Sequence, residues 1–286
     1  MVIRMVVSMK EMLEKAKKGK YAVPALNINN LEWTKYMLEE CETLKSPVIL
    51  GVSEGAAKYM GGFKVVSNLV NSLMEALNIT VPVALHLDHG SSVEACKKAL
   101  DSGFSSVMID ASKYPLEENI KITKEVVEYA NKFEASIEAE IGHIGGIEDG
   151  VQGGILCADI DECSIIVSSS NITALAPALG SVHGIYKGEP NLDFDRMKTI
   201  SENTNIPLVL HGATGIPDDK IKRAIECGTC KINLNTEFQL AWHKAVKEFI
   251  NTSEEYDPRK VIGSGEKAMK EAIRTKILLF GSKDKA

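Results

Sequence analysis

The chain has 286 residues, 44% of them hydrophobic, and a formal net charge of −6. An acidic balance without a basic tract argues against a nucleic-acid surface, so an anionic ligand has to be held by local groups. No apolar run approaches the ~20 residues that a membrane helix needs, and the six cysteines show neither a dense spacing pattern nor a preceding signal peptide. We therefore expect a soluble, cytoplasmic protein with reduced thiols that binds neither nucleic acid nor membrane.

Helical and strand patterns alternate through the first half of the chain. Apolar residues recur at helical spacing in some segments, and short apolar runs bounded by Gly, Pro or Ser separate them. The predicted order is helix 9–20, strand 21–27, helix 31–45, strand 47–53, helix 63–77, strand 82–88, helix 93–100, strand 106–110 and helix 115–133.

The alternation continues to the end. The predicted order is strand 136–142, a long Gly-rich loop 143–154, helix 159–169, strand 173–179, a second loop 182–190, helix 193–203, strand 207–212, helix 218–226, strand 231–236 and helices near 237–250 and 265–279. Eight strands alternating with helices predict a parallel sheet, and the absence of a linker favours closure into a (β/α)8 TIM barrel over an open doubly wound sheet. We expect residues 1–286 to form a single TIM-barrel domain with a C-terminal helical extension.

The third predicted strand ends in three titratable side chains and a glycine. His86 and Asp88 share one face of the strand because side chains alternate with a period of two. His89 would point to the opposite face if the strand continued. We expect the chain to turn at Asp88 and His89, which would bring a carboxylate and an imidazole together.

Polar residues stand at or near the C-terminal ends of several predicted strands. They are Ser53, Asp88, His89, Asp110, Glu140, His211, Asn233 and Asn235. In a barrel these ends form one mouth, where the active sites of this fold lie.

Two glutamates in one strand are expected to face the barrel interior. In 137–141 the apolar side chains take one face, and Glu138 and Glu140 take the other. An unpaired buried carboxylate costs several kcal/mol, so these groups need a cation. Lys231, which alternation places inward on the last strand, is one candidate, and an interior Glu138–Lys231 ion pair with only a structural role is an alternative to a functional role.

Three histidines follow different strands, and each precedes a glycine. His89, His183 and His211 offer three imidazoles at one predicted mouth, as in catalytic zinc sites. His243 is expected on the surface, and no role is predicted for His143. Cys227 and Cys230 have the spacing of a redox motif, but a structural role is favoured because they join a helix end to a strand.

Six motifs in order resemble those of the class II, metal-dependent fructose-bisphosphate aldolases. They are HLDHG at 86–90, EAEIG at 138–142 with GGIED at 145–149, ALGSVHG at 178–184, HGATG at 211–215, KINLNT at 231–236 and DPR at 257–259. The likeness covers nearly the whole chain. It departs from the family's common pattern at Leu26, His143 and Ala213.

The resemblance implies reversible cleavage of fructose 1,6-bisphosphate to dihydroxyacetone phosphate and glyceraldehyde 3-phosphate, in glycolysis or gluconeogenesis, through a zinc-stabilised enediolate. His89, His183 and His211 would bind the catalytic Zn²⁺, and Asp88 would be the acid/base at the aldehyde oxygen. Glu148 would move the proton at the carbon that becomes nucleophilic.

Further residues are implied around this centre. His86, Asp110 and Glu140 would lie near the metal or at an alternative metal position. The implied substrate-binding residues are Asn27, Ser53, Gly184, Lys187, Gly212, Thr214, Asn233, Asn235, Thr236 and Arg259. Lys187 would assist a phosphate or a monovalent cation, Na⁺ or K⁺. Arg259 would reach the other phosphate from a neighbouring subunit, which implies a homodimer or homotetramer.

Three alternatives remain at this stage. A tagatose-1,6-bisphosphate aldolase of the same fold acts on a substrate that differs only at C4. A Schiff-base aldolase would use Lys231 in place of a metal. An inactive barrel acting as a binding protein would need no complete set of metal ligands.

Overall fold

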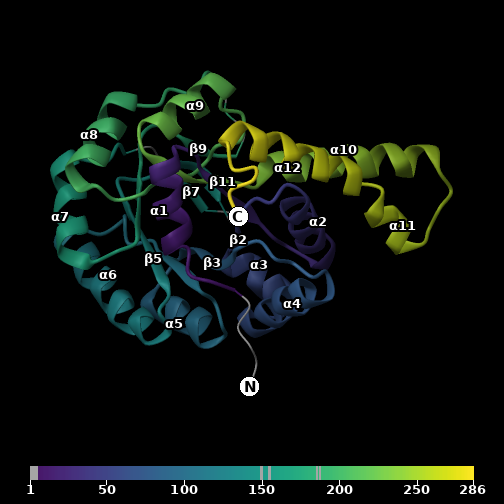
Figure 1. Ribbon diagram of the computed structural model, residues 1–286, viewed down its shortest axis with the longest axis horizontal. Helices are drawn as coiled ribbons and strands as arrows, with labels where there is room; N and C mark the ends of the chain where they lie inside the picture. Colours follow the sequence, from purple (N-terminus) through teal and green to yellow (C-terminus); the bar gives the residue numbers. More distant parts are fainter. Residues whose placement is uncertain (1–5, 149–150, 154–155, 185, 187) are drawn as a thin grey trace.

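Eight parallel strands close into a barrel, as predicted, in the order β1-β11-β10-β8-β5-β4-β3-β2 (Figure 1). This computed structural model describes residues 6–148, 151–153, 156–184, 186 and 188–286. The strands are β1 Val23–Asn27, β2 Val48–Val52, β3 Val83–Gly90, β4 Ser106–Ile109, β5 Ser136–Ile141, β8 Ala174–Pro177, β10 Leu208–Leu210 and β11 Thr229–Leu234.

Helices connect consecutive barrel strands, and further helices precede the first strand and follow the last. They are α1 Lys10–Gly19, α2 Leu31–Thr43, α3 Glu54–Tyr59, α4 Phe63–Ala76, α5 Val93–Asp101, α6 Leu116–Ala130 with the 3₁₀ turn η1 Asn131–Phe133, α7 Ile160–Ser170, α8 Phe194–Thr204, α9 Asp218–Glu226, α10 Thr236–Thr252, α11 Pro258–Gly263 and α12 Glu266–Phe280. The order of the helices agrees with the sequence prediction, and α3 and α11 are two short helices in segments for which no element was predicted.

Side-chain caps fix where several helices begin after the strands. Asn30, Ser53, Ser92, Asp159 and Asp193 each accept a backbone N–H from the first turn of the helix that follows. Such a cap contributes about 1 kcal/mol. The caps hold the chain where it leaves the mouth of the barrel, and therefore help to fix the loops that carry the polar residues.

The alternation of side chains along each strand separates two apolar regions. On β3, Leu85 and Leu87 join the large core that the strands share with the helices. Ala84 belongs to a second cluster, which includes Met9 and Leu13 from the helical segment that contains α1. Figure 1 shows α1 lying across the ring of strands. This second cluster fills the end of the barrel interior that α1 covers.

Two segments predicted as loops contain a small sheet. The Gly-rich segment forms an antiparallel hairpin of β6 Gly145–Glu148 and β7 Val151–Gly153, and β9 Val182–His183 pairs in parallel with β6. A bridge between His143 and Leu156 closes the base of the hairpin. Gly146, with φ of 102°, permits the approach, since a Cβ there would lie 2.2 Å from the His183 carbonyl oxygen.

The C-terminal part of the chain extends beyond the barrel. In Figure 1, α10 projects from the ring of strands with α11 at its far end, and α12 returns alongside α10. The division of residues 1–286 into one domain with this extension stays a prediction. Among the described residues, no helix combines the length and the apolar content needed to cross a bilayer.

Candidate active site

Three histidines converge at the mouth of the barrel. His89 comes from β3, His183 from β9, and His211 follows β10. One nitrogen from each ring lies within 4.8 Å of the others, and His89 Nε2 is 3.0 Å from His211 Nδ1. The three predicted ligands are therefore brought together, although 122 residues separate His89 from His211.

A bulge in β3 turns His89 toward the site. The strand continues to Gly90, contrary to the expectation that it ends at Asp88, but its register with β4 shifts between Leu87 and Gly90. His89 adopts φ of 50° within this irregularity. As a result, Asp88 and His89 line the same cavity although they are neighbours in a strand. The predicted turn is present as a bulge.

Carboxylates orient two of the imidazoles. Asp110 Oδ2 lies 3.2 Å from His89 Nδ1, and Glu138 Oε1 lies 2.8 Å from His211 Nε2. Burial opposes ionisation of both carboxyls, but hydrogen bonds and nearby positive charges lower the pKa of each. A carboxylate only accepts hydrogen bonds, so His89 Nδ1 and His211 Nε2 carry the protons.

The donor set fits a divalent metal. With those protons assigned, His89 Nε2 and His211 Nδ1 direct lone pairs into the same space, and His183 supplies the third nitrogen. Zinc and similar ions prefer such imidazole groups held by carboxylates. His89, Asp110 and Glu140 form a second group of close ligand atoms.

A buried network of charged side chains contacts His211 through Glu138. Lys231 Nζ donates to Glu138 Oε2 at 2.6 Å and lies 3.3 Å from His86 Nε2, with all three side chains inaccessible to solvent. The Glu138–Lys231 ion pair is thus present, and it is linked to His211. Burial, and then the Lys231 charge, lower the pKa of His86 to about 3, so His86 is neutral. Lys231 lines neither cavity at the mouth, which argues against a Schiff base.

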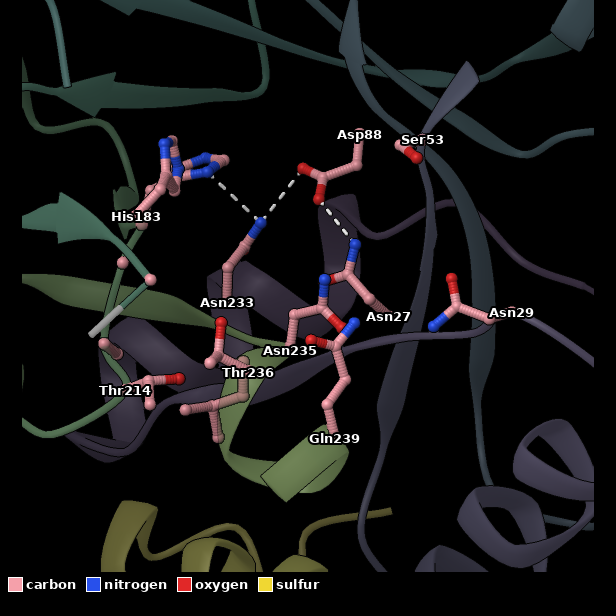
Figure 2. A pocket seen from close by; sticks show the side chains of 15 residues that line it. Asn27, Asn29, Ser53, Asp88, His183, Thr214, Asn233, Asn235, Thr236 and Gln239 are labelled. Carbon is pink, nitrogen blue, oxygen red and sulfur yellow. Dashed lines mark hydrogen bonds between the residues drawn. The ribbon is translucent and has the colours of Figure 1, made fainter. Parts of the chain in front are cut away.

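Asp88 is held by two amides (Figure 2). Asn27 Nδ2 donates to one carboxylate oxygen at 2.8 Å, and Asn233 Nδ2 donates to the other at 3.0 Å. Burial alone would raise the pKa of Asp88, but the electrostatic interaction of its carboxylate with His89, His211 and Lys231 outweighs this effect and lowers the pKa. The carboxylate is ionised and fixed in place.

Two cavities meet at this cluster. The first, of about 230 Å³, includes eight of the predicted substrate-binding residues, namely Asn27, Ser53, Gly184, Gly212, Thr214, Asn233, Asn235 and Thr236. The second, of about 390 Å³, lies beside His89, Asp110 and Glu140. Ser53, Asp88 and His183 line both. A ligand longer than either cavity could span the cluster.

Comparison with known proteins identifies the family of the chain. A family model described as fructose-bisphosphate aldolase class-II matches residues 7–285. The chain belongs to the class-II fructose-bisphosphate aldolases. It is therefore an aldolase, a carbon–carbon lyase, and the alternative of an inactive binding barrel is set aside.

Relatives of this aldolase resemble it along its whole length. A fructose-bisphosphate aldolase of Geobacillus stearothermophilus is 60% identical over 282 residues, 98% of each chain. A 6-phospho-5-dehydro-2-deoxy-D-gluconate aldolase of Bacillus subtilis is 54% identical over 281 residues, 98% of this chain and 97% of the relative. The crystal structure of the YdjI aldolase from Escherichia coli K12 has a TM-score of 0.87 at 34% identity, and the match covers 99% of this chain and 100% of that one.

Some expected site residues of the aldolase are not placed at the cluster. Arg259 is 88% exposed on the C-terminal extension, bonded to Asp257, and lines neither cavity. Lys187 lies outside the described residues. Glu148 ends strand β6, but its side chain is outside what the structure describes.

Sequence reasoning missed other residues of the cavities. Asn29 and Gln239 line the first cavity, and Lys113 lines the second. His143, one of the departures from the family pattern, also lines the second cavity. Asn29 follows a predicted strand end and could have been found by that position. Gln239 and Lys113 lie within or before helices, where polar residues are ordinarily exposed, so the sequence carries no distinguishing signal for them.

Proposed function

We propose that this aldolase reversibly cleaves fructose 1,6-bisphosphate to dihydroxyacetone phosphate and glyceraldehyde 3-phosphate, with Zn²⁺ held by His89, His183 and His211. This proposal rests on the observation that the three imidazoles and the fixed carboxylate of Asp88 lie where two cavities meet. The 60% identical relative named as a fructose-bisphosphate aldolase supports this substrate.

Asp88 is proposed to take the proton of the C4 hydroxyl. As the C3–C4 bond breaks, C4 becomes the aldehyde carbon and the electron pair passes to the ketone half, which Glu148 then protonates at C3. A bound zinc would supply the Lewis acidity that stabilises this negative charge. Asn27 and Asn233 each donate to one oxygen of Asp88, and this directs the remaining lone pairs of the carboxylate.

The first cavity is proposed to hold the phosphate of the ketone half. Its described lining contains no lysine or arginine, but the N-terminus of α10 opens into it at Asn235 and Thr236. Backbone N–H groups and the helix dipole at such an end favour an anion. Gly184, Gly212 and Thr214 complete this wall. Gly212, with φ of 63°, lies so close to β9 that a Cβ there would be 2.3 Å from the Val182 carbonyl oxygen.

A second candidate substrate is 6-phospho-5-dehydro-2-deoxy-D-gluconate, because a 54% identical relative carries that name. Aldol cleavage of this compound between C3 and C4 gives the same dihydroxyacetone phosphate. The aldehyde product differs: it is 3-oxopropanoate, with a carboxylate in place of the phosphate and no hydroxyl. The preference between these two substrates therefore depends on the second cavity, which would receive the aldehyde half.

The test is a coupled assay that measures dihydroxyacetone phosphate released by zinc-loaded protein. Fructose 1,6-bisphosphate, tagatose 1,6-bisphosphate and 6-phospho-5-dehydro-2-deoxy-D-gluconate are compared by kcat/KM. We expect the fructose substrate to be preferred at least roughly 10-fold, a difference of about 1.4 kcal/mol between transition states. A preference for either other compound would contradict the proposal.

The remaining expectations are also proposals. We propose a homodimer or homotetramer in which Arg259 of one subunit serves the site of another, because Arg259 is exposed and lines neither cavity of its own chain. A monovalent cation near Lys187 and a cytoplasmic location stay predictions.

A further inference from the structure

We propose that Lys113 binds the phosphate of the aldehyde half of the substrate and so determines specificity at that end. This inference rests on the proposed cleavage of fructose 1,6-bisphosphate. It concerns the second cavity, which Lys113 lines together with His89, Glu140 and His143.

The position of the second cavity suits the aldehyde half. It has a volume of about 390 Å³ and shares Ser53, Asp88 and His183 with the first cavity. If the ketone half occupies the first cavity, the remainder of the substrate passes Asp88 and enters the second. The phosphate at its far end then meets the outer wall, where Ser112 and Lys113 lie on the loop between β4 and α6.

The acidic groups that line this cavity favour a cation beside a bound phosphate. Glu54, Asp88, Asp110 and Glu140 all line it, and each contributes a carboxyl group. Among the described lining residues, Lys113 is the single lysine or arginine. A phosphate dianion entering a cavity with this many acidic groups would be repelled unless a positive group lay close to it.

Lys113 is available for this role. Its Nζ lies 5.1 Å from the centroid of the Tyr114 ring, and it forms no ion pair with a residue that the structure describes. The ammonium group is exposed, so it retains its hydration until an anion binds. Two acidic side chains of the cavity are already engaged: Glu54 accepts from Ser91 N–H, and Asp110 accepts from Ser112.

The loop that carries Lys113 is anchored on both sides. Ser112 Oγ donates to Asp110 Oδ1 at 2.7 Å, and His143 Nδ1 lies 3.4 Å from the same Ser112 oxygen. His143 is itself held by its backbone bridge to Leu156. Asp110 also contacts His89 Nδ1, so these hydrogen bonds connect the loop of Lys113 to the histidine cluster.

The experiment compares two aldehydes in the synthetic direction with zinc-loaded protein and dihydroxyacetone phosphate. Glyceraldehyde 3-phosphate and glyceraldehyde differ only in the phosphate. The ratio of their kcat/KM values is measured for the wild type, for Lys113→Met and for Lys113→Arg. Lys132→Met is a matched control, since Lys132 is also an exposed lysine over a tyrosine ring but lies next to the amino end of β5.

We expect Lys113→Met to lower the ratio roughly 10- to 100-fold, mainly through KM for the phosphorylated aldehyde, as for loss of a hydrogen bond between charged groups. Lys113→Arg should keep most of the preference, and Lys132→Met all of it. An unchanged ratio in Lys113→Met would overturn the assignment, including the case in which Arg259 of another subunit binds this phosphate alone. Failure of the wild type to cleave fructose 1,6-bisphosphate would instead overturn the proposed function.

Discussion

At the scale of single residues, neighbours in the sequence have separate tasks at the site. Asp88 accepts from Asn27 and Asn233, whereas His89 directs Nε2 toward His211. The bulge at His89 makes this division possible, because an uninterrupted strand would place the two side chains on opposite faces.

The division of tasks can be tested with two substitutions. Asp88→Asn should keep one zinc per chain but lose roughly 10²- to 10⁴-fold in kcat, since the amide cannot accept the proton. His211→Ala should lose the metal, because one of three imidazoles is removed. Metal analysis after gel filtration and steady-state kinetics distinguish the two variants. Stoichiometric zinc in His211→Ala would refute the ligand assignment.

At the scale of elements, the pairing of β6 with β9 positions His183. A Cβ at Gly146 would lie 2.2 Å from the His183 carbonyl oxygen and would force the strands apart. Gly146→Ala should therefore weaken zinc binding about 10-fold or more, as measured by competition with a chromogenic chelator. Gly188→Ala is the control, because nothing lies within 4 Å of the added methyl group. Equal zinc affinity in both variants would show that this pairing does not position the ligand.

Glu42, in the last turn of α2, has a carboxylate whose ionisation stabilises the contact between α2 and the segment that precedes β3. Glu42 accepts N–H bonds from Thr80 at 2.7 Å and Val81 at 3.1 Å, and it contacts Lys45. Burial tends to raise the pKa of Glu42, but these hydrogen bonds outweigh it and lower the pKa from 4.5 to about 2. A carboxyl with a depressed folded pKa contributes stability above its unfolded pKa and loses it as the pH falls toward the folded value.

Glu42→Gln should therefore lower the free energy of unfolding by about 1–2 kcal/mol near pH 6. The difference from the wild type should shrink below pH 4.5 and disappear near pH 2. Urea unfolding followed by circular dichroism at several pH values measures it. A difference that stays constant from pH 6 to pH 3 would contradict a role for the ionised carboxylate.

The sequence predicts the barrel elements well and the irregular ones poorly, for a physical reason. A strand such as β2 is an apolar run between Pro47 and the helix cap Ser53, and burial on both faces explains its composition. The hairpin β6–β7 and the short strand β9 depend on pairing with each other, and their many glycines carry no strand preference. The helices α3 and α11, of six residues each, are too short for a periodic pattern.

Some features of the candidate site could likewise be predicted from the sequence, and others could not. His89, His183 and His211 were predictable because each follows a strand and precedes a glycine, and the barrel brings strand ends together. The Glu138–Lys231 pair was predictable from strand alternation. The role of Glu138 in orienting His211 was not, because it depends on which side chains meet across the barrel interior.

At the scale of the whole molecule, the helix that contains Arg259, α11, lies at the far end of the C-terminal extension (Figure 1), and Arg259 lines neither cavity of its own chain. If a neighbouring subunit supplies this side chain, mixing two inactive variants should restore activity. Asp88→Asn and Arg259→Ala, refolded or co-expressed together, should form some sites with both native residues and regain up to about one quarter of the wild-type rate, as random pairing in dimers gives. A mixture that stays as inactive as its parents would contradict a shared site.

The most direct test of the central claim is metal-dependent cleavage of fructose 1,6-bisphosphate. The protein is stripped with a chelator, checked for retained secondary structure, and titrated with Zn²⁺ while dihydroxyacetone phosphate release is followed. We expect no cleavage without metal and a linear rise in rate that ends at one zinc per chain, with no trapping by borohydride. Full activity of the stripped protein, or a covalent adduct at Lys231 after borohydride treatment, would contradict a metal-dependent aldolase.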